Sequence, residues 1–134
     1  MMSPPEALDR LRAGNRRFVT NTQSGDADRC VAKVEPLRSG QQPFATILGC
    51  ADSRVPPEII FDQGIGDIFV GRVAGNFENV DMLGSFEFGA KVAGSKVIVV
   101  LGHTQCGAVK GAADGVELGN LTEMLANFDE ALAE

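Results

Sequence analysis

Two cysteines and one histidine lie in two short polar loops, each directly after an apolar run. Cys50 begins the loop 50–54, whereas His103 and Cys106 both lie in the loop 103–107. Thiolate sulfur and imidazole nitrogen are ligands that zinc prefers, and three protein ligands leave a tetrahedral zinc one open position. An open position is the arrangement of catalytic zinc sites. These residues therefore predict a catalytic centre with one Zn²⁺ per chain.

The elements that must position these loops alternate between helix and strand. Short apolar runs predict strands at residues 44–49, 67–73 and 96–102. Apolar periodicity and capping signals predict helices at residues 3–18, 56–61 and 79–93, another beginning near residue 106, and one from residue 120 to 132. Helix–strand alternation favours an α/β fold, a parallel sheet flanked by helices. Ligands bind at the carboxyl ends of such strands, where both loops lie.

Two of these helices carry a capping box, Ser3 with Glu6 and Asn120 with Glu123. The polar segment 21–40 between the first helix and the first strand is expected to be an extended connector. The apolar stripe expected on the helix at 79–93 comprises Met82, Leu83, Phe86, Ala90 and Ala93. The third strand is expected to have an unpaired edge unless something covers it.

Composition excludes several classes of protein. The net charge of −6 argues against nucleic acid, whose phosphates require a basic face. No apolar run approaches the roughly 20 residues needed to span a membrane, and no export signal is visible, so we expect a soluble, cytoplasmic protein. Three cysteines, without a C-x-x-C pair, argue against a disulfide framework and a thioredoxin-type redox motif. Cys30 lies in the polar connector and is interpreted as incidental.

The two loops resemble the two-part signature of the β-class carbonic anhydrases. The signature comprises Cys50-x-Asp52-x-Arg54 and His103-x-x-Cys106-Gly107, and the resemblance extends to residues 51–56, 72–76, 84–88 and 102–110. It implies zinc ligation by Cys50, His103 and Cys106, and a catalytic dyad of Asp52 and Arg54. In a closed form known in part of this family, the aspartate becomes the fourth ligand.

The resemblance also implies a substrate site. Gln41 corresponds to a glutamine that donates to a bicarbonate oxygen in the active site of the partner subunit, and the Gly107 amide would be a second donor. Phe69, Ala74 and Phe88 correspond to positions that line the apolar CO₂ pocket. A homodimer or larger homo-oligomer is therefore expected, with active sites at the interface and the N-terminal helix wrapping the neighbour. Ile47 replaces a tryptophan used for bicarbonate inhibition in some members, which favours the open form.

The function implied is the reversible hydration of CO₂ to bicarbonate and a proton, by attack of zinc-bound hydroxide. The expected organisation is a single domain over 1–134, with an N-terminal helix and connector arm at 1–40 and a zinc-binding core at 41–134. The family fold continues with further strands, so the chain is expected to be C-terminally short and to lack them.

Alternatives to this function remain open. A related enzyme could hydrolyse CS₂ or COS at the same kind of zinc. A non-catalytic, zinc-stabilised module left by truncation is the alternative from another class. Taken singly, each residue also has a plain interpretation, such as a buried core cysteine or a surface ion pair.

Overall fold

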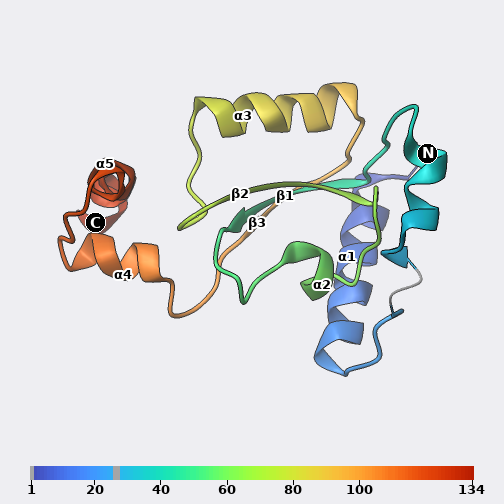
Figure 1. The fold of residues 1–134 in the computed structure, drawn as a ribbon, viewed down its shortest axis with the longest axis horizontal. Helices are drawn as coiled ribbons and strands as arrows, with labels where there is room; N and C mark the ends of the chain where they lie inside the picture. Colours follow the sequence, from blue (N-terminus) through green and yellow to red (C-terminus); the bar gives the residue numbers. More distant parts are fainter. Residues whose placement is uncertain (1, 26–27) are drawn as a thin grey trace.

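The computed structural model describes residues 2–25 and 28–134, and within them a three-stranded parallel sheet forms the centre of the fold (Figure 1). The strands are β1 (Ala45–Cys50), β2 (Ile68–Val73) and β3 (Ile98–Leu101), in the order β2-β1-β3. Cys50 pairs with Val73, and Gly49 pairs with Leu101. The three strands therefore end at the same edge, close to the two loops singled out in the sequence.

Helices cover both faces of this sheet, which confirms the predicted α/β architecture (Figure 1). One face carries α1 (Pro4–Val19) and α2 (Pro57–Ile60), and the other carries α3 (Val80–Glu87) with its π-helical continuation η4 (Phe88–Val92). Beyond the carboxyl ends of the strands lie α4 (Gly107–Ala113), α5 (Asn120–Leu125), the 3₁₀ turn η5 (Ala126–Phe128) and α6 (Asp129–Leu132). No described helix is long and apolar enough to cross a membrane.

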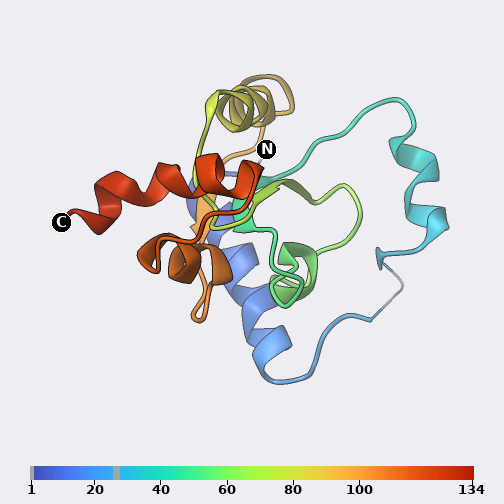
Figure 2. The same cartoon turned by 60° about the vertical axis from the view of Figure 1, so that its left-hand side comes forward.

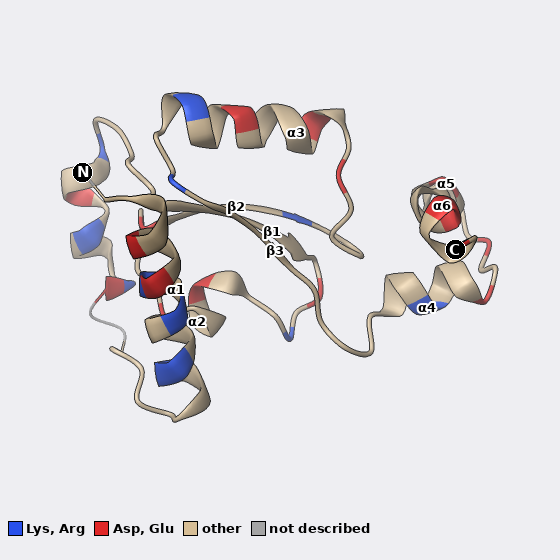
Figure 3. Ribbon diagram, turned by 180° about the vertical axis from the view of Figure 1, so that it is seen from behind, with Lys and Arg blue, Asp and Glu red and all other residues tan. Residues whose placement is uncertain are grey.

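The first helix begins where its sequence signals predict. The Ser3 and Glu6 side chains form the capping box, and Pro4 is the first helical residue. Ala7 and Leu11 are buried against a core of Phe44, Ala45, Ile47 and Phe61. The rest of α1 carries charges of both signs (Figure 3). In this structure α1 thus covers the sheet of its own chain.

All six residues of β1 are buried, because this strand lies between two others and under helices on both faces. Such burial explains why its sequence is a continuous apolar run rather than an alternating one. The edge strand β3 differs, since Ile98 and Val100 on its α3 side are 50% and 63% exposed. Among the described residues β3 pairs only with β1, as the sequence led us to expect.

Three local predictions were wrong. The connector is not fully extended, because it forms the 3₁₀ turns η2 (Val31–Lys33) and η3 (Glu35–Leu37). The helix predicted over 120–132 is broken at η5, and Gly119, at φ 47°, is its N-cap in place of a capping box at Asn120. On α3, Leu83 is 49% exposed although it belongs to the predicted core stripe.

A buried carboxylate fixes the connector to the core. The Asp62 side chain is 1% exposed, and it accepts hydrogen bonds from Arg17 Nε at 2.5 Å and Arg29 Nη2 at 3.1 Å. Ser24 donates to it through its amide, at 3.1 Å, and its hydroxyl, at 2.9 Å. Burial raises the pKa of Asp62, but Arg17 and Ser24 lower it more, to about 2. This depressed pKa makes the cluster sensitive to acid.

Asp62→Asn is expected to lose a contribution to stability that depends on pH. The pKa of an unfolded aspartate is about 3.9, so the ionised Asp62 stabilises the fold above about pH 4 and loses this effect as the pH falls towards 2. The free energy of unfolding, measured with urea, should differ from that of the unaltered protein by about 2 kcal/mol at pH 6 and converge with it near pH 2. Asp9→Asn, at an exposed pair with Arg12, is the control. A difference that stays constant with pH would contradict this prediction.

Candidate metal centre

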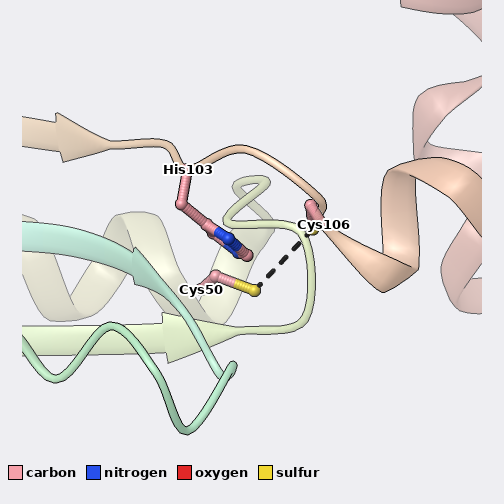
Figure 4. A group of neighbouring side chains, drawn as sticks. All are labelled: Cys50, His103 and Cys106. Atoms are coloured by element: carbon pink, nitrogen blue, oxygen red, sulfur yellow. Dashed lines mark hydrogen bonds between the residues drawn. The ribbon is translucent and has the colours of Figure 1, made fainter.

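The three predicted ligands come together at the carboxyl edge of the sheet (Figure 4). Cys50 is the last residue of β1, His103 follows β3, and Cys106 is the N-cap of α4. One donor atom from each lies within 4.8 Å of the other two, and the two sulfurs are 3.9 Å apart. The parallel sheet thus places side chains that are more than 50 residues apart in the sequence at a single point.

The geometry of the donors fits a zinc ion. Tetrahedral angles and Zn–S bonds of about 2.3 Å place two thiolates about 3.8 Å apart, close to the distance seen here. His103 Nδ1 lies 2.9 Å from the carbonyl oxygen of Thr104, which can only accept, so Nδ1 carries the proton and Nε2 keeps a lone pair. Within the described residues, Nε2 is the single buried side-chain nitrogen or oxygen that lacks a hydrogen-bond partner. An orphaned, buried lone pair facing two sulfurs is what a metal ligand requires.

The electrostatics of the cluster also favour a cation. Burial raises the pKa of the Cys50 thiol, whereas hydrogen bonds from the Gly75 and Asp52 amides lower it. Together with the neighbouring His103 and Cys106 side chains, these amides outweigh burial and lower the pKa to about 7. The Cys50 sulfur in turn raises the pKa of His103. The lowered pKa favours the Cys50 thiolate, and a thiolate beside an imidazole nitrogen is a donor set that suits a cation.

The predicted dyad forms beside the cluster. Arg54 donates to both carboxylate oxygens of Asp52, from Nε at 2.9 Å and Nη2 at 2.6 Å, and its amide donates to Oδ1 at 2.9 Å. These hydrogen bonds hold the pKa of Asp52 well below its usual range. Asp52 Oδ2 is 4.0 Å from His103 Nε2. The carboxylate is therefore turned towards Arg54 while remaining next to the candidate ligands.

Two further residues, Arg72 and Gly75, support the cluster, and the sequence did not predict a role for either. Arg72 donates to the carbonyl oxygens of Cys50, at 2.7 Å, and Asp52, at 2.6 Å, and so fixes the main chain of the first loop. The Gly75 amide donates to Cys50 Sγ at 3.2 Å. Both lie in the segment 72–76, which the sequence singled out only as part of the resemblance. Glycine at 75, where φ is 85°, was the one available signal.

The predicted substrate residues divide into two groups. Ala74 follows β2 next to Gly75, and Gly107 follows Cys106, so both lie beside the cluster. Gln41 belongs to the second group, because it precedes β1, and this strand extends for about 17 Å before it ends at Cys50.

Phe69 is four residues before Val73, the partner of Cys50, which places it about 13 Å along β2 from the level of the cluster. Its ring packs against Phe88, with the ring centroids 6.0 Å apart. Gln41, Phe69 and Phe88 therefore lie away from the metal ligands of their own chain.

Comparison with known proteins gives a consistent family. Residues 45–134 match the family model described as carbonic anhydrase. Over 119 residues, 89% of this chain, the sequence is 45% identical to carbonic anhydrase 2 of Mycobacterium tuberculosis and 41% identical to a carbonic anhydrase of Mycolicibacterium smegmatis. One of two tetrameric β-carbonic anhydrases from Sordaria macrospora superposes with a TM-score of 0.67 at 27% identity, over 91% of this chain and 59% of that one.

The chain spans 57% of the length of either bacterial relative. The matched part holds the Cys-His-Cys cluster, the parallel sheet and the helices around it. Sequence identity above 40% over most of the chain and a shared fold lead to one assignment. The chain belongs to the carbonic anhydrase family, in its β class.

Proposed function

We propose that this chain binds one Zn²⁺ through Cys50, His103 and Cys106 and catalyses the reversible hydration of CO₂ to bicarbonate and a proton. The observation that carries the proposal is the Cys-His-Cys cluster, whose donors lie within 4.8 Å and include a buried, orphaned histidine nitrogen. When bound with one position open, zinc supplies a Lewis acid that lowers the pKa of a water molecule towards neutrality. Everything else in the reaction depends on how the chain's own residues hold substrate and protons.

Asp52 and Arg54 are proposed to order the open position. The ion pair keeps Asp52 ionised, so the carboxylate can only accept a hydrogen bond. Arg54 also donates to the carbonyl oxygen of Gln105 at 3.0 Å, which ties the first loop to the loop that carries His103 and Cys106. Held in this way, Asp52 would not ligate the metal and would accept a hydrogen bond from the reacting water. This hydrogen bond would fix the orientation of the lone pairs on the water oxygen.

A complete substrate site is proposed to need a second copy of the chain. Ala74 and Gly107 lie beside the ligands, and the Gly107 amide is available to a substrate oxygen as the first N–H of α4. Gln41, Phe69 and Phe88 lie away from the ligands of their own chain, so the substrate-site roles that the resemblance implies for them would place them at the cluster of a neighbour. This arrangement supports a homodimer or larger homo-oligomer with the active sites at its interface.

Stopped-flow measurement of CO₂ hydration, on protein of measured zinc content, tests the proposal. One zinc per chain and hydration well above the buffer rate are expected at about pH 8 to 9, where the water is ionised. One zinc without hydration would leave the non-catalytic module, and protein that binds no zinc would exclude both. Turnover of CS₂ or COS in place of CO₂ would indicate the related hydrolase.

A further inference from the structure

The segment that follows α4, which comprises α5, η5 and α6, lies beside α4 (Figures 1 and 2). Leu125, at the end of α5, is 5% exposed and lies beside Gly111 of α4. The N-cap of α4 is Cys106, so α5 braces the helix that follows this ligand. Three residues further on, Phe128 of η5 contacts Gly75 in the turn that follows β2, and the amide of Gly75 donates to Cys50 Sγ.

Phe128 fits closely over Gly75. A Cβ atom at Gly75 would lie 2.2 Å from Phe128 Cζ and 3.1 Å from both Cε atoms, so the ring occupies the space that any other residue would need. Phe77 meets the same ring edge to face, with centroids 5.8 Å apart and an interplanar angle of 83°. Gly75 itself is buried. The ring is thus matched to a glycine and held by a second aromatic side chain.

The turn beneath Phe128 has a backbone that packing must maintain. Gly75 and Asn76 are consecutive residues with positive φ, 85° and 43°, and the Asn76 amide closes the turn on the carbonyl oxygen of Val73 at 2.9 Å. Left-handed conformations of residues other than glycine are costly, and they persist where surrounding structure holds them. In this conformation the Gly75 amide faces Cys50 Sγ at 3.2 Å.

We propose that Phe128 is a positioning residue for the metal centre. Its ring holds the turn at Gly75 so that the Gly75 amide donates to the Cys50 sulfur. Hydrogen bonds to a ligating atom orient it and tune its charge, and their loss typically lowers metal affinity 10- to 100-fold. The inference rests on the proposed zinc centre for its consequence, but the contact between Phe128 and the Gly75 turn is tested without metal.

The first measurement is the Gly75 amide in metal-free protein carrying nitrogen-15 glycine, which gives one signal for each of 16 glycines. Phe128→Ala should speed the hydrogen exchange of the Gly75 amide about 10-fold, because the hydrogen bond to sulfur is weakened. Leu132→Ala, at an exposed site on α6, controls for the substitution itself.

The second measurement is the zinc dissociation constant, from competition with a chelator. It should rise about 10-fold in Phe128→Ala and less in Phe128→Leu, which keeps apolar bulk if the alanine variant fails to fold. The inference would be overturned if, in whichever variant folds, the hydrogen-exchange rate of the Gly75 amide and the zinc dissociation constant both stayed within 2-fold of the unaltered protein. If the unaltered protein binds no zinc, the proposed function fails, and the Gly75 signal alone decides whether Phe128 positions the turn.

Discussion

Cys106→Ser is expected to remove most of the bound zinc. A serine hydroxyl is neutral at pH 7 and is a much poorer zinc ligand than a thiolate, so two protein ligands would remain where three are needed. The zinc dissociation constant should rise on the order of 100-fold or more, beyond the effect of losing an outer hydrogen bond. Zinc content after dialysis against a weak chelator should fall from about one ion per chain to well below one.

Cys30→Ser is the matched control for this variant. Cys30 is exposed and precedes η2 in the connector, away from the cluster, so its replacement should leave one zinc per chain. Circular dichroism of both variants without metal separates the loss of a ligand from the loss of the fold. Full zinc content in Cys106→Ser would show that Cys106 is not a ligand, and the proposed centre would then be wrong.

The parts of the fold that the sequence predicted well are those with a strong local signal. The six residues of Ala45–Cys50 are all buried, and the sequence indicates this because the strand is a continuous apolar run. The capping box of α1 formed because Ser3, Pro4 and Glu6 act within a single turn. The meeting of the two loops also followed from sequence, since parallel strands bring their carboxyl ends to the same edge.

Side chains that compete with the helix backbone account for one failure. The helix from residue 120 breaks at η5, where Asn127 Nδ2 donates to the carbonyl oxygen of Met124 at 2.8 Å. The expected capping box did not form because the N-cap lies one residue earlier, at Gly119, and Thr122 Oγ1 accepts from the Leu118 amide. Such contacts depend on the final backbone, and apolar periodicity does not carry them.

The apolar stripe of α3 illustrates a second limit. Leu83 and Phe86 line an open groove together with Leu48 of β1 and Ile98 and Val100 of β3. Periodicity predicted correctly that this face of α3 is apolar. It could not say which element, if any, lies opposite, because burial depends on contacts between segments remote in the sequence. The supports given by Arg72 and Gly75 were missed for the same reason.

Asp52→Asn is expected to keep zinc and lose most of the activity. The Asn amide has nearly the shape of the carboxylate but no charge, so the ion pair with Arg54, made through contacts of 2.6 and 2.9 Å, is lost. The side chain could then donate to the reacting water in place of accepting from it, which removes the constraint on the orientation of its lone pairs. Loss of a positioned proton acceptor typically costs at least about 100-fold in rate, and kcat/KM for CO₂ should fall by that order.

Asp114→Asn is the control, because Asp114 also accepts from a cationic side chain, that of Lys110, but lies on the surface at the end of α4. It should keep both zinc and activity. Comparing kcat/KM per bound zinc separates the roles that Asp52 could have. If Asp52→Asn loses zinc as Cys106→Ser does, the carboxylate contributes to ligation. If it keeps zinc and full kcat/KM, the pair with Arg54 only braces the loop, since a carboxylate that orders the reacting water cannot be replaced without slowing the reaction.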